Sequence, residues 1–514
     1  MKGHLIRSKQ SAQSFTTTGT TGRLKGAAAS VEIHLGGGAQ AHRRRRSLGN
    51  APRRVNREEA GGDMSAQTPF SGGPGTHLVV SKAIRRFLAI SGMLLGGFAA
   101  AHATGTDQAP IVVATSGDYP PFSLAAAQAD APPTGYGPSV IQAYAEERGR
   151  EIEFVSFRWP SLLEALTQDR FDIAVGGLTV RPDRLLAGRF SVPVAQSGAL
   201  VLVPKESRFR DLETLNKPDV RIAVNHGGHL ERVTRSTFPK AQVVPVQANQ
   251  DVVAYLKGGL AEAVVTDTVE APLWQEKIPQ TRRIGPFTQD RKAFLMPPDQ
   301  KTLAADLDAW LLEQAQDGSL EDIRIRTLGP SQAQPEVGQP LTALLAAMDD
   351  RLSLMAAVAE AKRKTGTPIE VPEREREVLA AAIRNVETHD GTAAIGKISQ
   401  ERAQRRSALR HLFRAQIESA KAVQLANGKT ASPQSHPPDL KTVLRPALIR
   451  IGEQITLIVG TLPVDLEPQE VRQATAQALA HYALDEALLD ALSQGIVAVA
   501  RSNATASRLS PIPQ

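Results

Sequence analysis

One stretch of the sequence, residues 171–184, contains the residue types needed to hold a small anion. It reads FDIAVGGLTVRPDR, an apolar run followed by two glycines and then by Thr179 and Arg184. Glycines let the main chain approach a ligand closely, and a guanidinium can bind a carboxylate through two parallel hydrogen bonds. The pattern predicts a carboxylate site at the end of a buried strand. A strand-to-helix junction with a surface arginine would contain the same residues, so both interpretations stay open at this point.

A second group of chemically active residues begins at Arg351. Lys362 follows it by eleven residues, close to three helical turns, so a helix places both cations on one side with Met348 and Met355. Two cations that face a helical core are costly unless an anion binds there, although each one separately could extend its charge to solvent. Gln424 continues an apolar stripe in the same way, and a buried amide needs hydrogen-bond partners. These residues predict a second anion site.

Residues 109–330 must position the first site. They alternate short apolar runs with amphipathic stretches, which predicts strands interleaved with helices in parallel α/β sheets. The expected strands are 111–115, 152–157, 171–175, 200–203, 221–224 and 263–266. The pattern restarts after about Lys205, which indicates two lobes. Because ligands of such folds bind at the carboxyl ends of the strands, we expect the first site between the lobes.

The second site belongs to a chain that reads as helix throughout, after a linker at 330–340 that is rich in Pro, Gly and Gln. Apolar residues recur every 3.5 positions from Leu341, until Gly366 and Pro368 end this first helix. Further helices are expected from residue 372 onward and at about 398–424, 440–458 and 468–500. We therefore expect an all-helical domain over 341–505.

The net charge of +7 is not spread evenly over the chain. Residues 1–103 contain 15 Lys and Arg against 4 Asp and Glu, whereas residues 104–514 contain 45 against 49. The basic excess belongs to the leader, so a nucleic-acid-binding surface on the folded part has little support. The chain contains no cysteine, and its stability must therefore come from packed cores.

Residues 81–103 have the layout of a secretory signal peptide, with Lys82, Arg85 and Arg86 ahead of a short apolar run that closes on small residues. A transmembrane anchor would need roughly 20 uninterrupted apolar residues, and this run is shorter and contains Gly and Ser. We expect cleavage after about Ala103, export to a bacterial periplasm and no stable membrane anchor. Residues 1–80 are then a basic extension, either disordered or the product of a misassigned start.

The α/β part resembles the type-3 periplasmic solute-binding proteins over about residues 108–329. Within them it is similar to cyclohexadienyl dehydratase, which converts prephenate or arogenate to phenylpyruvate or phenylalanine. The motifs that carry the resemblance are SGDYPPF (116–122), RWPSLLEAL (158–166), residues 171–184, VNHGGHLERV (224–233) and GGLAEAVVTDTVEA (258–271). The resemblance implies a two-lobed α/β domain over 104–329.

The same resemblance assigns roles to residues of these motifs. Arg184 and Thr179 would hold a substrate carboxylate, and Asp118 and Trp159 would shape the cleft. The other implied substrate-binding positions are Asn225, Gly227 and Gly228. Glu270 falls on the position of the family's general acid, which would protonate the hydroxyl that leaves C4 of prephenate. A binding protein can use an acidic residue here to hold an α-amino group instead, so Glu270 alone does not establish catalysis.

Four positions depart from the patterns of this family. Gly137 and Ser139 stand where the superfamily usually has acidic residues, and His229 and Leu230 replace a small polar pair of the dehydratase. Loss of acids near the cleft fits a dianionic ligand without an amino group. His229 either adds a proton donor or fills space.

The helical part resembles the all-helical chorismate mutases, in particular their secreted class, over about residues 341–460. The motifs are DRLSLMAAVAEAKRKTGTPIEVPERERE (350–377), LFRAQIESAKAVQ (412–424) and PPDLKTVLRP (437–446). The resemblance implies that Arg351 and Arg445 hold the carboxylates of chorismate and that Lys362 and Gln424 donate hydrogen bonds to its ether oxygen.

Two further roles and two departures complete this second resemblance. Arg374 would assist binding, and Glu375 would accept a hydrogen bond from the ring hydroxyl. Val371 stands where the relatives often have Asp, and Ala420 where they often have Ser or Thr. Since the rearrangement needs a compact conformer and stabilisation of the charge that develops on the breaking C–O bond, it requires no nucleophile, metal or cofactor.

The two resemblances support each other, because chorismate mutase makes the prephenate that the dehydratase consumes. The sequence therefore predicts a bifunctional exported enzyme that takes chorismate to phenylpyruvate, with small molecules as its partners and arogenate left open as a second substrate. One alternative is a periplasmic binding protein that delivers a small carboxylic acid to a transporter. Another keeps the mutase active and makes the α/β half a prephenate or phenylalanine sensor.

Overall fold

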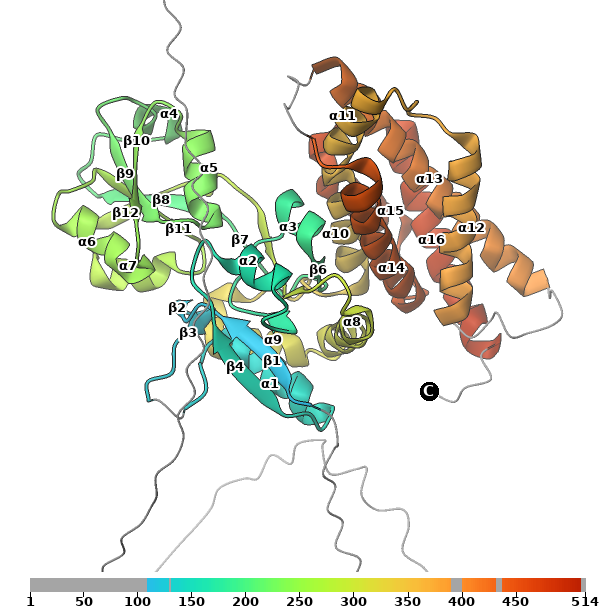
Figure 1. Ribbon diagram of the computed structural model, residues 1–514, viewed down its shortest axis with the longest axis horizontal. Coiled ribbons are helices and arrows are strands. Elements are labelled where there is room, and N and C mark those ends of the chain that lie inside the picture. Colours follow the sequence, from blue (N-terminus) through green and yellow to red (C-terminus); the bar gives the residue numbers. More distant parts are fainter. Residues whose placement is uncertain (1–108, 129–130, 390–399, 431–436, 510–514) are drawn as a thin grey trace, which may run out of the picture. The chain divides into compact units, whose positions relative to one another are not determined.

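Two five-stranded sheets form the frame of the α/β part in the computed structural model (Figure 1). The structure describes residues 109–128, 131–389, 400–430 and 437–509, and all of them belong to the unit Ala100–Gln514. The expected extension at 1–80 and the expected signal peptide at 81–103 lie outside the described residues. Within the described ranges, no helix has the length and apolar character needed to cross a membrane.

The first lobe contains the sheet in the order β4-β1-β5-β14-β6. Its strands are β1 (Ile111–Thr115), β4 (Ile152–Ser156), β5 (Ile173–Ala174), β6 (Arg189–Phe190) and β14 (Leu295–Met296). Its helices are α1 (Tyr136–Glu147), α2 (Leu162–Thr167), α3 (Pro182–Ala187), α8 (Lys301–Gln316) and α9 (Ser319–Leu328). A hairpin of β2 (Asp118–Tyr119) and β3 (Ser123–Leu124) follows β1 and brings the SGDYPPF motif to the carboxyl end of the sheet.

The second lobe repeats the same topology in the order β10-β9-β11-β8-β12. Its strands are β8 (Ala199–Pro204), β9 (Arg221–Asn225), β10 (Gln242–Val246), β11 (Ala263–Asp267) and β12 (Thr281–Ile284). Its helices are α4 (Leu212–Leu215), α5 (His229–Thr237), α6 (Val252–Lys257) and α7 (Ala271–Lys277). Side chains of β8 alternate between two buried clusters, Val201 with α5 and Leu200 with α6 and α7, so both faces of the sheet are covered.

Two antiparallel strands connect the lobes. β7 (Ala195–Ser197) leads out of the first lobe and β13 (Asp290–Lys292) leads back into it. The predicted parallel pairing is confirmed for β1 with β4 and β5 and for β9 with β10 and β11. It was wrong for two strands, because β8 runs antiparallel to β11 and β12, and β14 runs antiparallel to β5 and β6. Each of these two strands follows a crossing strand directly, so each enters its sheet from the side opposite to the other strands.

The helical part contains α10 (Pro340–Ser353), α11 (Met355–Thr365), α12 (Pro372–His389), α13 (Gln400–Thr430), α14 (Arg445–Thr461), α15 (Pro468–Ala478) and α16 (Glu486–Leu509), with one π-helical turn at Leu440–Leu444. The expected stop is present, since α11 ends at Thr365 and Gly366 has a φ of 65°. The two-lobed α/β domain followed by a helical domain is thus confirmed.

Two helices expected to be continuous are interrupted. The first breaks at Leu354, where the Ser353 hydroxyl donates to the Asp350 carbonyl at 2.7 Å and competes with the main-chain bond to that carbonyl. The second, expected over 468–500, breaks between α15 and α16. There Ala483 adopts a φ of 49°, and the Tyr482 hydroxyl donates to the Asp349 carboxylate at 2.8 Å.

Helix α14 connects the helical part to the first lobe. It contacts α3 and α8, and the Arg450 guanidinium donates to the carbonyl oxygens of Leu185 and Leu186 at 3.0 Å each. These carbonyls lie in the last turn of α3, where a cation is favourable. α14 therefore supports the helix that carries Arg184.

Candidate functional site

A pocket of about 50 Å³ lies between the two lobes, at the carboxyl ends of β1, β5, β9 and β10. Eight residues singled out from the sequence line it: Asp118, Trp159, Thr179, Arg184, Asn225, Gly228, His229 and Leu230. Gly227 packs beside them, because a side chain there would meet Pro160 at 3.0 Å. The structure thus brings the predicted binding residues of the α/β part together, while their individual roles stay predictions.

Arg184 is the most deeply buried cation of this pocket, with 2% of the residue exposed. Its Nη1 donates to the Thr179 carbonyl at 2.9 Å, and its guanidinium lies 5.1 Å from the centre of the Trp159 ring. Burial, followed by the nearby charge of Arg181, lowers the pKa of Arg184 to about 9, so it remains charged at neutral pH. A buried guanidinium held by a main-chain carbonyl and a ring face retains donors for an anion.

The two glycines that precede Thr179 are required by close packing. Gly177 has a φ of 78°, and a Cβ on it would lie 2.6 Å from the Tyr119 ring. Gly176 has a φ of 107°, and its Cβ would lie 2.9 Å from Ser123. Only glycine combines this backbone conformation with such close contacts. Gly137 is also packed closely, since a Cβ there would meet the Gly176 nitrogen at 2.8 Å, so the acidic residue of the relatives would not fit.

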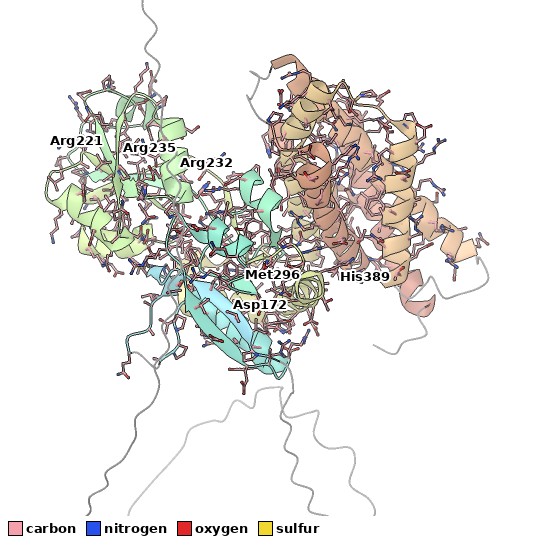
Figure 2. All side chains as sticks on the ribbon, in the orientation of Figure 1. Asp172, Arg221, Arg232, Arg235, Met296 and His389 are labelled. Atoms are coloured by element: carbon pink, nitrogen blue, oxygen red, sulfur yellow. The ribbon has the colours of Figure 1, made fainter. Side chains whose placement is uncertain are left out.

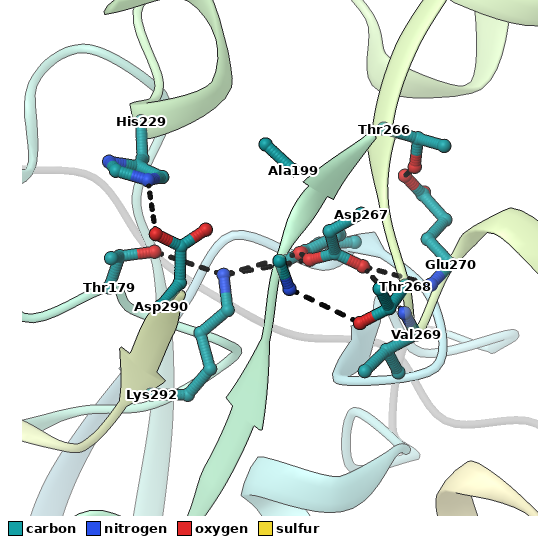
Figure 3. Close-up of polar contacts among 12 residues, drawn as sticks. Thr179, Ala199, His229, Thr266, Asp267, Thr268, Val269, Glu270, Asp290 and Lys292 are labelled. Atoms are coloured by element: carbon teal, nitrogen blue, oxygen red, sulfur yellow. Dashed lines mark hydrogen bonds and ion pairs between the residues drawn. The ribbon is translucent and has the colours of Figure 1, made fainter. Parts of the chain in front are cut away.

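Sequence reasoning missed Lys292, which lines the pocket and is 3% exposed. Its Nζ donates to the Thr179 hydroxyl at 2.9 Å and to the Tyr119 hydroxyl at 3.4 Å, and lies 3.6 Å from the Asp267 carboxylate (Figure 3). Lys292 is 108 positions beyond Arg184 on the crossing strand β13, and no local motif marks it. Residues 289–296 read QDRKAFLM, four polar residues followed by four apolar ones, which does not mark any of them as a pocket residue.

Glu270 lies at the start of α7, just after β11, and is completely buried. Its Oε1 accepts from the Asn249 amide at 2.6 Å and its Oε2 contacts the Thr266 hydroxyl at 2.7 Å. Burial, followed by the negative charge of Asp267, raises the pKa of Glu270 to about 8. The carboxyl therefore keeps its proton at neutral pH. Asn249 is part of the pocket wall, so Glu270 lies one hydrogen bond beyond that wall.

His229 is tied to the returning strand β13. Its Nε2 lies 2.9 Å from the Asp290 carboxylate, which also accepts from the Thr288 hydroxyl at 2.9 Å. Burial is the largest cause that lowers the pKa of His229, so the ring is neutral at pH 7. With Nε2 donating to Asp290, the buried Nδ1 is left as an acceptor without a partner among the described residues.

Contacts across the cleft hold the lobes closed over this pocket. The Tyr119 hydroxyl of the first lobe donates to Asp267 of the second, and Asn249 donates to the Asp118 carbonyl at 3.2 Å. Arg232 on α5, labelled in Figure 2, lies 3.4 Å from Asp183 on α3. Pockets for drug-sized ligands start at roughly 300 Å³. The pocket between the closed lobes is therefore smaller than such a site.

Two of the predicted cations of the helical part are held by main-chain oxygens. Arg351 on α10 is partly buried and donates to the Leu448 carbonyl of α14 at 3.4 Å. Lys362 on α11 donates to the Ile369 carbonyl at 2.8 Å. Burial lowers the pKa of both, and for Lys362 the charge of Arg445 lowers it further while Glu375 opposes this shift. Lys362, Glu375 and Arg445 are therefore near neighbours.

Gln424 is buried on α13 and faces α11. Its Nε2 donates to the Ala420 carbonyl at 3.1 Å and contacts the Met355 sulfur at 3.5 Å, while its Oε1 has no partner among the described residues. Met355 follows Arg351 by one helical turn. The structure therefore places Gln424 against Met355, the first residue of α11. Ala420, a departure from the relatives, contributes through its main chain.

Arg374 does not join this group. Its guanidinium pairs with Glu377 at 2.8 Å on the same turn of α12, where both side chains are exposed. Its neighbour Glu375 does reach inward, accepting from Lys421 at 3.4 Å and from the Val371 main-chain nitrogen at 3.3 Å. The helical periodicity that points Glu375 inward points the adjacent Arg374 outward.

A larger cavity of about 300 Å³ contains none of the predicted site residues. It lies where β6 and α8 meet α14, and its cations are already engaged: Glu453 pairs with Arg189 at 2.9 Å and with Lys301 at 2.7 Å. Among the residues that the structure describes, no cluster of three or more acidic or histidine side chains could hold a metal ion.

Comparisons with known proteins agree with this geometry. Residues 111–329 match the family model of bacterial extracellular solute-binding proteins, family 3, and residues 342–425 match that of chorismate mutase type II. Cyclohexadienyl dehydratase of Pseudomonas aeruginosa is 32% identical over 213 residues, which cover 40% of this chain and 78% of that protein. An arginine-binding protein of an Escherichia coli ABC transporter is 24% identical, over 40% of this chain and 86% of its own length.

Among solved structures, an ancestral amino acid-binding protein described as a precursor of cyclohexadienyl dehydratase is 29% identical, with a TM-score of 0.40. The match covers 43% of this chain and 95% of that one. The chain therefore belongs to the cyclohexadienyl dehydratase family of type-3 solute-binding proteins and, with the chorismate mutase type II domain that follows, is a bifunctional enzyme with a lyase and an isomerase domain.

Proposed function

We propose that the protein converts chorismate to prephenate in its helical domain, residues 341–505, and prephenate to phenylpyruvate in its α/β domain, residues 104–329. The chain combines a chorismate mutase domain with a domain similar to cyclohexadienyl dehydratase. In the second of these, Glu270 is buried and its pKa is raised to about 8. This combination is the observation that carries the proposal. The product of the first reaction is the substrate of the second.

In the dehydratase step, Glu270 delivers its proton to the C4 hydroxyl of prephenate, which leaves as water. The bond from C1 to its carboxylate breaks, CO₂ departs, and the electron pair completes the aromatic ring of phenylpyruvate. A protonated acid of pKa about 8 is suited to this task at neutral pH. Arg184 and Thr179 hold a carboxylate, and closure of the lobes shields the reaction from water.

In the mutase step, the helices hold chorismate in a compact conformer. Arg351 and Arg445 bind its two carboxylates, and Lys362 and Gln424 donate to the ether oxygen as its bond to carbon breaks. These donors are fixed in advance by α10, α11, α13 and α14, so little reorganisation is needed when charge develops. Glu375 accepts from the ring hydroxyl. Arg374 has a weaker basis, because its exposed guanidinium is paired with Glu377.

The second candidate function is a periplasmic binding protein whose α/β domain captures a small carboxylic acid without changing it. The matches to amino-acid-binding proteins favour it, since one of them is covered over 86% of its length. A version with an active mutase would make the α/β domain a sensor of prephenate or phenylalanine. If the ligand is an amino acid, Glu270 would act as a ligand for its amino group.

One assay separates these functions. The purified protein is incubated with chorismate at pH 7.5, and chorismate, prephenate and phenylpyruvate are followed over time beside a control without protein. Loss of chorismate with accumulation of phenylpyruvate supports the bifunctional enzyme. Prephenate that accumulates without formation of phenylpyruvate supports the sensor. Unchanged chorismate supports the binding protein.

For the location, we infer export to the periplasm through cleavage after about Ala103. The family model is that of extracellular proteins, and the layout of residues 81–103 supports export. Fractionation of the producing bacterium, with N-terminal sequencing of the mature chain, tests this. A mature protein that begins near residue 104 in the periplasmic fraction is expected, and a cytoplasmic protein with an intact N-terminus would contradict it.

A further inference from the structure

Lys421, a sheltered lysine of the helical part, has no role among the mutase residues identified above. It lies on α13, and Gln424 follows it by three positions, so the two side chains are neighbours on the surface of that helix. The Lys421 side chain is only 13% exposed, although a lysine stem is long enough to extend its charge into solvent. Contacts within the protein therefore keep this ammonium against the bundle.

Three carboxylates surround the Lys421 ammonium. Its Nζ lies 2.9 Å from Glu418 on the same helix, 3.4 Å from Glu375 on α12 and 3.6 Å from Glu370 just before α12. Burial opposes the charge, but these carboxylates together raise the pKa of Lys421. The side chains of Glu418 and Glu370 are 45% and 70% exposed, whereas that of Glu375 is 27% exposed. Because solvent screens exposed ion pairs, the pair with Glu375 is the one that fixes a side chain.

Glu375 is held from two sides at the start of α12, which packs beside α13 (Figure 1). Its Oε1 accepts from the main-chain nitrogen of Val371 at 3.3 Å, and its Oε2 accepts from Lys421. Within the described ranges, Lys421 is the one cation that forms an ion pair with Glu375. Val371 stands where the relatives often have Asp, so Glu375 must accept from the ring hydroxyl without help from a carboxylate at position 371.

We propose that Lys421 is a positioning residue of the mutase site, whose ammonium holds the Glu375 carboxylate in place to accept the hydrogen bond of the ring hydroxyl of chorismate. This inference rests on the proposed mutase function and adds a residue to it. Without Lys421, the partly exposed Glu375 carboxylate is free to turn toward water, and the hydroxyl loses a fixed acceptor. Arg374 cannot replace the lysine, because its guanidinium pairs with Glu377 at 2.8 Å.

The first test measures kcat and KM for chorismate in the full chain. A hydrogen bond to the ring hydroxyl is present before and during the rearrangement, so its loss weakens binding without slowing the bound substrate. Lys421→Met removes the charge and should raise KM by about tenfold and change kcat by less than about twofold. Lys421→Arg keeps the ion pair and should bring KM back to within about threefold of the original value. Cooperative thermal unfolding shows that each variant is folded.

A double-mutant cycle shows whether Lys421 acts through Glu375. In the Glu375→Gln protein, Lys421→Met should change KM by less than about twofold, because the carboxylate that the lysine positions is already gone. Glu418→Gln is the matched control: it removes another partner of Lys421 and leaves the pair with Glu375, so KM should stay within about twofold. Effects of Lys421→Met and Glu375→Gln that simply multiply would assign Lys421 a general structural role and overturn the proposal.

Binding keeps this inference separate from the proposed function. Calorimetry compares two oxabicyclic diacids that mimic the compact conformer of chorismate, one with the ring hydroxyl and one without it. The unchanged protein should bind the hydroxylated diacid about tenfold more tightly, and Lys421→Met should abolish this preference. That result upholds the role of Lys421 even if no prephenate forms. A preference that survives in Lys421→Met overturns the role of Lys421 and leaves the mutase function standing, whereas failure of both diacids to bind, with no prephenate formed, overturns both.

Discussion

The α/β pocket and the proposed helical site both contain cations, but different groups hold those cations. In the α/β pocket, Lys292 is paired with the Asp267 carboxylate of the opposite lobe. In the helical site, Lys362 and Arg351 donate to the main-chain carbonyls of Ile369 and Leu448. The Asp267 carboxylate neutralises the charge of Lys292, whereas the main-chain carbonyls leave the charges of Lys362 and Arg351 available to an anion.

This difference follows from how each scaffold admits its ligand. The two lobes can separate along β7 and β13, so an ion pair across the cleft can break as the ligand enters and form again around it. Packed helices have no such motion, and a carboxylate partner buried among them would compete permanently with the substrate. Arg184 of the α/β pocket is held like Lys362 and Arg351, on a main-chain carbonyl, so the difference between the two sites lies in Lys292 and its ion pair across the cleft.

The largest expected effect separates the two sites completely. Glu270→Gln keeps the shape of the side chain and removes its acidic proton, so phenylpyruvate formation should fall by about 10³-fold or more. Mutase activity should be unchanged, because Glu270 belongs to the second lobe of the α/β part and not to the helical part. The measurement is the rate of each step with its own substrate.

A matched control for this change is Glu276→Gln, the same substitution at an exposed position of α7. It should leave both rates unaltered. A Glu270→Gln protein that still forms phenylpyruvate at more than about a tenth of the original rate would show that another group supplies the proton.

The reverse separation is expected from Gln424→Ala. Loss of one preorganised donor to the ether oxygen should lower mutase kcat by about 10²- to 10³-fold, while turnover of supplied prephenate stays the same. Gln404→Ala, an exposed position on the same helix α13, provides the control. Equal loss of both activities in Gln424→Ala would argue against two independent sites.

The pH dependence should also differ between the sites. Because the pKa of Glu270 is raised to about 8, its proton is present below that pH and is lost above it. Dehydratase kcat/KM should therefore be level near pH 7 and fall about tenfold per pH unit above 8. Mutase activity, which depends on no such acid, should change less between pH 7 and 9.

The same proton predicts a stability effect of defined sign. In the unfolded chain Glu270 ionises near its ordinary value of 4.5, whereas the folded site retains the proton to about 8. The contribution of the protonated Glu270 to the free energy of unfolding is therefore complete below pH 4.5 and is lost as the pH rises toward 8. Glu270→Gln should raise the melting temperature relative to the unchanged protein at pH 9 and not at pH 5. An equal difference at both pH values would contradict the buried, protonated carboxyl.

Local motifs predicted much of the first site, because the two glycines, Thr179 and Arg184 lie in one short stretch that runs from the end of β5 into α3. Lys292 could not be predicted, since only the crossing of β13 between the lobes places it beside Thr179. On α12 the motif placed Arg374 and Glu375 together, but adjacent helical residues point in different directions, and only Glu375 reaches the cations. Sequence periodicity also missed the break at Leu354, which depends on the hydroxyl of Ser353 competing with a main-chain bond.

The smallest expected effect tests whether the two sites are fully separate. Strand β13 carries Asp290, which holds His229, and Lys292. Arg291 lies between these two residues and points to the other face of the strand, toward α10. Arg291 donates to the Ala346 carbonyl at 3.1 Å and pairs with Asp349 at 2.7 Å and with Asp350. The next residue is Arg351, so one strand supports a cation in each site.

Arg291→Gln removes the positive charge that pairs with Asp349 and Asp350 on α10. With Asp350 unpaired and Asp349 left only with Tyr482 and His481, α10 should hold Arg351 less precisely. This raises the KM for chorismate by about three- to tenfold and changes kcat little, as expected for weaker ground-state binding. Dehydratase kcat/KM should change by less than about twofold, because Lys292 keeps its partners on the other face of β13. Arg283→Gln, at an exposed position of β12, controls for loss of a cation. The KM for chorismate is also measured with prephenate bound in the α/β site. If prephenate shifts this KM in the unchanged protein and not in Arg291→Gln, then strand β13 couples binding at the two sites, and they are not independent.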